Sequence, residues 1–291
     1  MRTGTERITP DIAKSYLTQN LVNRSVKRAT VEKYVRALKR GTFKTTPSGI
    51  AFDTDGTLVD GQHRLLAIAV SGIPAVMNVS RDVPKDAVEY IDRGTSRSIR
   101  DVLSINSRRN PGEESPVPVN QKLISALSQL AACAAPNHKL RVGTDDIIAL
   151  MDAFRPAAEA VYAELMTKSK IKARAPIFAA AIAAVSCGVD VSAVSKFFQI
   201  VFCDDVTGCD EFNINAALNF KSQIEQARAA RVHIERKKLY LSAQNAIYHF
   251  SNNTGVTRVI SPSSARYDVS SMVTHALLLD VDTVSSPVAV A

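Results

Sequence analysis

Residues 58–68 read Leu-Val-Asp-Gly-Gln-His-Arg-Leu-Leu-Ala-Ile, and this stretch decides the fold of the first third of the chain. A short apolar run ends at Asp60, and the apolar side chains after Gly61 recur with helical spacing as far as Gly72. This pattern predicts a strand, a tight turn and a helix. The amides and dipole of a helix start favour an anion, so the turn is a candidate phosphate site.

The side chains at this turn suit phosphate chemistry. Gly61 lets the backbone approach a ligand closely, and Arg64 supplies a bidentate donor. We take Gln62 as a further binding residue, and Asp60 and His63 as candidate catalytic residues, since His63 can donate or carry a proton. The alternative is a turn glycine followed by solvated polar side chains, with Asp60 only capping the helix.

The flanking elements predict an α/β domain over residues 1–105. Thr9 and Pro10 begin a helix that runs to about residue 20, and a second helix spans residues 30–40. Two short strands, 49–53 and 57–61, are joined by an Asp-Gly hairpin signal. A strand at 73–79 and a short helix from Pro84 complete the domain.

The rest of the chain predicts a different architecture. Residues 106–118 are rich in Pro, Gly, Ser and charge, which is typical of a linker. Residues 119–251 carry apolar positions with a period of 3.6, which predicts a mainly α-helical domain. Residues 252–291 predict a short strand and then a C-terminal tail that is ordered only in part.

The turn also carries a family resemblance. Gly61, Arg64 and Ala67 match the Gly-x-x-Arg-x-x-Ala signature of the ParB/sulfiredoxin superfamily. The fuller Asp-Gly-Gln-His-Arg form resembles the DGQHR-type ParB-like proteins found in bacteriophage genomes and regulators of DNA phosphorothioation. Asn23-Arg24 and residues 92–103 also resemble segments of the phage proteins. The resemblance implies a ParB/sulfiredoxin-like fold in the first domain and a nucleotide-binding, DNA-associated protein of phage origin.

Two departures restrict what the resemblance implies. Gln62 stands where sulfiredoxin has its catalytic cysteine, so we expect no repair of sulfinic acids. The second nucleotide motif of chromosome-partitioning ParB proteins is not recognisable, which argues against a CTP-driven DNA clamp. What the resemblance still implies is a nucleotide phosphate at the helix that begins near Gln62.

A second group of residues is expected to complete this pocket. Asn23 and Arg24 lie in an expected loop, and Arg97 and Ser98 begin another expected helix after Gly94. If these segments converge with Gly61–Arg64, they line a phosphate pocket. Asp60 and Asp92 are candidate ligands of Mg²⁺, and the expected cofactor is ATP or CTP with Mg²⁺. The alternatives are that Asp92 only pairs with a neighbouring arginine and that Ser98 is an ordinary N-cap. A nucleotide hydrolase or phosphotransferase, and a pure protein-interaction module, stay open as other functions.

The distribution of charge points to a polyanion. The chain carries 36 Lys and Arg against 28 Asp and Glu, a net charge of +8. Residues 1–50 hold eleven basic and three acidic residues, which is the same surplus. We expect DNA phosphate contacts without base readout, and a basic run at 228–238 could extend them. A merely solvated basic face is the alternative. The expected DNA-contacting residues are Arg28, Lys33, Arg36, Lys39 and Arg40.

Several classes of protein are not expected. The four cysteines form no CxxC pair, and the histidines are scattered, which argues for reduced thiols and against a structural metal site. No run approaches the ~20 apolar residues of a membrane helix, and the start carries no secretory signal. We therefore expect no membrane partner and a cytoplasmic location, in the host if the protein is phage-encoded. Whether the chain forms an oligomer stays an open question.

Overall fold

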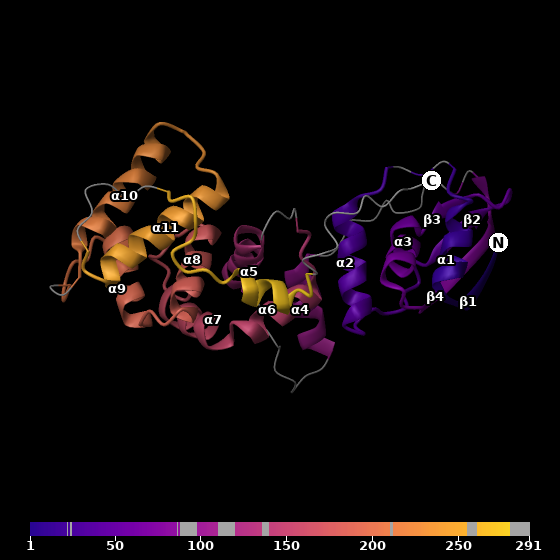
Figure 1. Cartoon of the computed structure of the whole chain (residues 1–291), viewed down its shortest axis with the longest axis horizontal. Coiled ribbons are helices and arrows are strands. Elements are labelled where there is room, and N and C mark those ends of the chain that lie inside the picture. Colours follow the sequence, from indigo (N-terminus) through magenta and orange to yellow (C-terminus); the bar gives the residue numbers. More distant parts are fainter. Residues whose placement is uncertain are drawn as a thin grey trace. The chain divides into compact units, whose positions relative to one another are not determined.

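The computed structural model describes residues 1–21, 23, 25–85, 87, 98–109, 120–135, 140–209, 212–254 and 261–279 (Figure 1). The chain divides into two compact units, Met1–Arg97 and Ser98–Ala291. The predicted boundary of the first domain, at residue 105, therefore lies eight residues after the end of the first unit at Arg97. Helix α4 (Ile99–Arg109) packs on helices of the second unit and places Leu103 in their core, which is why it belongs there.

The first unit contains a mixed sheet of four strands in the order β1-β4-β2-β3. The strands are β1 (Arg2–Ile8), β2 (Ile50–Asp53), β3 (Leu58–Asp60) and β4 (Ala75–Val83). The outer pairs β1–β4 and β2–β3 are antiparallel, and the central pair β2–β4 is parallel. The sequence predicted β2, β3 and most of β4 but not β1, whose residues are mostly polar and exposed.

Three helices complete the first unit. They are α1 (Pro10–Leu17), α2 (Arg28–Lys39) and α3 (Gln62–Ser71), and α3 lies between α1 and α2 (Figure 1). Thr9 caps α1 by accepting a hydrogen bond from the Ile12 amide, as its sequence predicted. Apolar side chains of α1, α2, α3 and all four strands form one core, so the start of α3 is held against the sheet.

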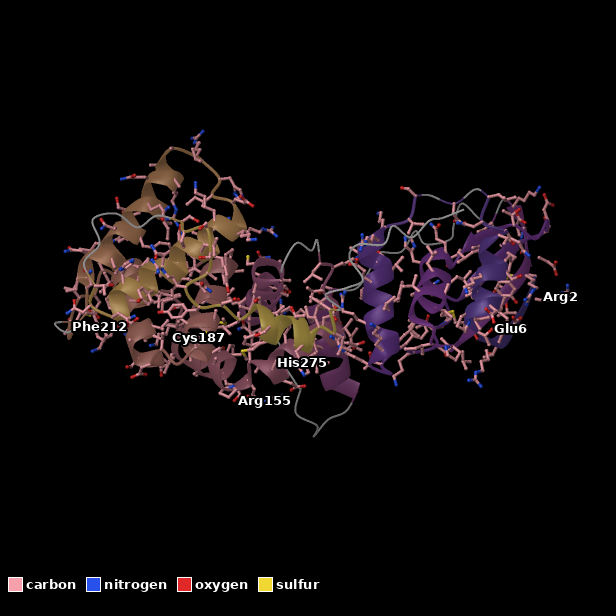
Figure 2. The ribbon with its side chains drawn as sticks, in the orientation of Figure 1. Arg2, Glu6, Arg155, Cys187, Phe212 and His275 are labelled. Atoms are coloured by element: carbon pink, nitrogen blue, oxygen red, sulfur yellow. The ribbon has the colours of Figure 1, made fainter. Side chains whose placement is uncertain are left out.

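A polar triad joins the edge strand to the first helix. The Tyr16 hydroxyl donates to the Glu6 carboxylate at 2.8 Å, and the Arg81 guanidinium donates to both Glu6 and the Tyr16 oxygen. Figure 2 labels Glu6 on this unit. The hydrogen bond from Arg81 lowers the pKa of Glu6, against the opposing effect of partial burial, and the Tyr16 hydroxyl lowers it further.

Acid is therefore expected to weaken the attachment of β1. Because the folded-state pKa of Glu6 lies below its ordinary value of 4.5, its stabilisation is present above that pH and is lost as the pH falls through the lowered value. Glu6→Gln should destabilise the first unit by at most about 1 kcal/mol near neutral pH, since the pair is partly exposed.

The measurement is hydrogen exchange of the β1 and β4 amides in the wild type and the variant at about pH 7 and in acid. The difference between the two proteins should shrink in acid. Asp11→Asn, which removes an exposed carboxylate of α1, is the control. A difference that is independent of pH would contradict the expectation.

The second unit is helical in its described residues, as predicted. After α4 it contains the following helices, in chain order: α5 (Gln121–Ala134), α6 (Thr144–Ala153), α7 (Arg155–Val161), the π-helical turn η2 (Tyr162–Met166), α8 (Ala175–Ser186), α9 (Val191–Cys203), α10 (Ile214–Ala229), α11 (Arg236–Ser251) and α12 (Ser270–Ala276).

Helix α8 is the centre of this unit. Nine of its twelve residues are buried, and it packs against α5, α7 and α11 (Figure 1). A helix that is apolar on all sides belongs inside a bundle, and its many alanines let the neighbouring helices approach closely. A cluster of phenylalanines around Phe197 fills the space beside it.

The predicted linker and tail differ from the structure in part. Residues 106–109 continue α4, and the rest of the predicted linker lies outside the described residues. Within the predicted tail, α12 packs on α5 and α6 with Val273 and Leu277 buried. The predicted strand at 256–260 lies outside the described residues. In the described part of the chain, no helix combines the length and the apolar character needed to cross a bilayer.

Candidate functional site

Gly61 is required by the packing of the chain on itself. It adopts a left-handed conformation with φ of 104°, and an added Cβ would lie 3.1 Å from the Ile50 Cα. The neighbouring Gly49 is tighter still, because its Cβ would lie 1.8 Å from the Asn78 carbonyl oxygen. The two glycines let β2 pass between the start of α3 and β4. The close approach that the sequence assigned to a ligand is thus made by the protein's own backbone.

Arg64 ties the turn to the sheet. Its Nη1 donates to the Gly49 carbonyl at 2.6 Å and lies 3.5 Å from the Asp60 carboxylate. The guanidinium carbon also lies 6.0 Å from the centre of the Tyr34 ring on α2. Asp60 in turn accepts a hydrogen bond from the Gly61 amide. Arg64 therefore has a structural role, and with 18% of its side chain exposed it also reaches solvent.

A segment after α1 lies over the turn, and we call its described residues 18–21, 23 and 25–27 the strap. The buried Gln62 accepts a hydrogen bond from the Asn20 side chain at 3.2 Å. Asn23 donates to the Asn20 side chain and to the Leu58 carbonyl, both at 2.6 Å. Asn20 was missed from sequence. Its signal was a second carboxamide three residues before Asn23.

His63 holds the other end of the strap. Its Nε2 accepts a hydrogen bond from the Lys27 amide at 3.0 Å, so the ring proton lies on Nδ1. Nδ1 is therefore a hydrogen-bond donor. Lys27 itself is exposed and brings a positive charge to the same segment. His63 is thereby better suited to hold an anion than to remove a proton.

The structure brings six of the predicted site residues together: Asn23, Asp60, Gly61, Gln62, His63 and Arg64. The predicted residues Arg24, Asp92 and Arg97 lie outside the described residues. Ser98 belongs to the second unit, where its hydroxyl accepts from the Asp101 amide at 3.2 Å and the Asp101 carboxylate accepts from the Ser98 amide at 3.1 Å. Ser98 is therefore the N-cap of α4, which is the alternative that the sequence left open.

One of the five predicted DNA-contacting residues does not face solvent. Arg36 is only 3% exposed, although it lies across α2 from Val31, Tyr34 and Leu38, which pack on the core of the unit. Contact between Arg36 and DNA phosphates stays a prediction, and this burial argues against it. Arg28 and Lys39 are exposed, and Arg28 pairs with Glu32 at 2.9 Å. Lys33 and Arg40 are partly exposed.

The site has few groups for a metal. Asp60 is balanced by Arg64, and within the described residues no three His, Cys, Asp or Glu side chains gather in a way that could hold a metal ion. A Mg²⁺ ion would therefore take most of its ligands from a bound phosphate and water. The four cysteines are free thiols, and burial raises the pKa of Cys133 to about 11.

Comparisons with known proteins found no match to this chain among family models, curated proteins or solved structures.

Proposed function

We propose that the first unit binds the phosphates of a nucleotide at the start of α3, and that the protein acts in association with DNA. One observation carries the proposal: α3 is ten residues long, and its N-cap is Gly61, which has no side chain to cap the amides of the first turn, while the Asp60 carboxylate accepts from the Gly61 amide. The amides of such a helix start favour an anion. The ParB/sulfiredoxin-like identity implied by the Gly61, Arg64 and Ala67 motif, and a phage origin, belong to the same proposal.

The charges around the helix start support this choice. Arg64 neutralises Asp60, and the exposed Lys27 adds a positive charge to the strap. Phosphoryl oxygens of ATP or CTP would accept from these donors. Mg²⁺, brought by the nucleotide, would let Asp60 face a phosphate without repulsion. On this account the strap residues Asn20 and Asn23 are positioning residues.

DNA association is assigned to the exposed cations of the first unit. Because Arg36 is buried, we assign the DNA contacts of α2 to the other four predicted cations, which are Arg28, Lys33, Lys39 and Arg40. Tyr34, the aromatic side chain of α2, packs against the core, and no reading helix is recognisable, so these cations suit phosphate contacts. Binding through them should be sensitive to salt and nearly independent of DNA sequence.

The nucleotide site is tested by calorimetry and thermal shift of the full chain with ATP, CTP and Mg²⁺. A nucleotide at 100 times its Kd should stabilise the protein by ~2.7 kcal/mol. Lys27→Gln should weaken nucleotide binding about tenfold, since one charge-assisted hydrogen bond contributes ~1.5–3 kcal/mol. Lys27 is exposed, so the variant should keep its fold.

The matched control is Lys14→Gln, which removes the same charge from α1, where Lys14 pairs with Asp11. An equal loss of affinity in both variants would mean a general charge effect and would contradict the site. Absence of binding by any nucleotide would instead favour a protein-interaction module. Release of inorganic phosphate from the bound nucleotide would identify an enzyme.

A further inference from the structure

The second unit contains a surface cavity of about 520 Å³, which we call the basin. Three helices, α4, α8 and α11, begin at its rim, and the N-terminal half of α5 forms one wall. Its lining residues are Ser98, Ile99, Arg100, Gln121, Ile124, Ser125, Ser128, Gln129, Arg174, Ala175, Pro176, His233 and Arg236.

The lining is strongly cationic. Its described residues include Arg100, Arg174 and Arg236, and no Asp or Glu is among them. Arg174 donates to the Ile234 carbonyl at 3.4 Å, which joins the segment before α8 to the segment before α11. Within the part of the chain that the structure describes, no carboxylate lies within ion-pair distance of these arginines. Three guanidinium groups around one cavity repel one another unless an anion lies between them.

The helix starts add to this positive potential. Neither α8, of twelve residues, nor α11, of sixteen, has a side-chain cap from the described residues. Each uncapped start presents amide N–H groups and the positive end of a helix dipole. The two acidic residues nearest in sequence are Asp101, which caps α4 with Ser98, and the exposed Glu235. Of these two carboxylates, that of Asp101 is already hydrogen-bonded to Ser98.

A polar group in the lining lacks a partner. The Gln129 side-chain oxygen is enclosed and accepts no hydrogen bond from the described residues. Gln129 as a whole is partly exposed, and an enclosed carboxamide oxygen without a partner costs free energy unless a ligand or water completes it. By turning its carboxamide, Gln129 can accept from a hydroxyl or donate to a phosphoryl oxygen. This observation is independent of the arginines and the helix starts.

The cationic surface extends beyond the cavity. The segment that leads to α8 adds the exposed Lys170 and Lys172, and the last turn of α10 and the segment after it add the exposed Arg228 and Arg231. Arg174 and Ile234 join the two segments at the basin, so the charges of both segments belong to its surroundings in sequence. A single small anion would need only the basin, whereas a backbone with repeated phosphates would use the flanking charges as well.

We propose that the basin and its flanking cations bind the phosphate backbone of DNA, with one phosphate seated among Arg100, Arg174 and Arg236. The described lining residues of this site all belong to the second unit, so its test is independent of the test of the nucleotide site at α3. Side chains here meet phosphates and not base edges, so binding is independent of sequence.

The test measures binding of the full chain to a fluorescent random-sequence DNA duplex by anisotropy, between about 50 and 200 mM salt. The double variant Arg100→Gln, Arg236→Gln should bind at least tenfold more weakly at the lower salt concentration. Its plot of log affinity against log salt should be flatter by roughly 1.8 units, since each lost phosphate contact removes ~0.9. Neither arginine has a structural partner in the described residues, so the thermal melt should not change.

The matched control is Arg155→Gln, Lys168→Gln, which removes two positive charges of the same unit that are paired with carboxylates. It should keep the affinity and salt slope of the wild type. Equal weakening of both double variants would overturn the proposal, and so would absence of DNA binding by the wild type at low salt. Binding of inorganic phosphate that the Arg100, Arg236 variant abolishes, without any binding of DNA, would overturn it too.

A parallel arm separates this site from the cations of α2. Lys33→Gln, Lys39→Gln tests the DNA association proposed for the first unit and leaves the basin intact. Loss of DNA binding in this variant alone would overturn the basin proposal. Loss in the Arg100, Arg236 variant alone would support the basin and remove α2 from the DNA interface. Hydrogen exchange should show DNA-dependent protection in the first turns of α8 and α11.

Discussion

Replacement of Phe197 by alanine is expected to destabilise the second unit by about 3–5 kcal/mol. The Phe197 side chain on α9 is fully buried, and its ring lies 5.5–6.0 Å from three other phenylalanine rings. Truncation removes buried apolar surface, leaves a cavity and breaks three aromatic contacts at once. The rings that it contacts belong to Phe198, Phe220 and Phe250.

Hydrogen exchange of the α8 and α11 amides measures this loss, because the most protected amides of a unit report its global opening. Leu218→Ala on α10 is the control, since that side chain is 43% exposed and should change stability by no more than ~0.5 kcal/mol. Equal exchange rates in the Phe197→Ala variant and the wild type would show that this cluster does not hold the unit together.

Gly49→Ala is expected to destabilise the first unit by about 3 kcal/mol or more, at or above the upper end of the usual range for overpacking. The new Cβ would meet the Asn78 carbonyl oxygen at 1.8 Å, and a backbone atom inside a sheet cannot move aside as a flexible side chain can. Either β2 separates from β4 or the turn shifts. Both outcomes disturb the Gly49 carbonyl, to which Arg64 donates.

The effect should appear as faster hydrogen exchange in β2 and β4 and as loss of nucleotide affinity in the same variant. Gly4→Ala on β1 is the control, because its Cβ would meet nothing within 4 Å. A Gly49→Ala protein with wild-type exchange would show that the close approach of β2 and β4 is not needed. Exchange in the second unit should not change in either variant.

The turn at residues 58–71 shows how far local pattern reaches. Strand β3, the turn at Gly61 and helix α3 up to Gly72 were all predicted, because the spacing of apolar residues and the positions of turn glycines are local properties of the sequence. The helical class of the second unit followed from the same periodicity. Strand β1 was missed, since seven mostly exposed residues become a strand only by pairing with β4, more than sixty residues away.

The contacts within the candidate site could not be predicted from local sequence. The residue types were sufficient to name Gly61, Gln62, His63 and Arg64, but their partners depend on distant segments. Arg64 bonds Gly49, Gln62 bonds the strap and His63 accepts from Lys27. Such contacts have no period in sequence, so a donor that looks available for a ligand can already be engaged by the fold.

Local elements, the two-part organisation and the surplus of positive charge can all be predicted from the chain's residues, because spacing and composition carry that information directly. The tertiary structure decided which of those charges face solvent: it buried Arg36 and gathered Arg100, Arg174 and Arg236 around one cavity. These three arginines come from segments more than sixty residues apart, and only the packing of α4, α8 and α11 places their starts together. The electrostatic field of a cluster falls off steeply with distance, so its strength depends on folded distances that no local pattern encodes.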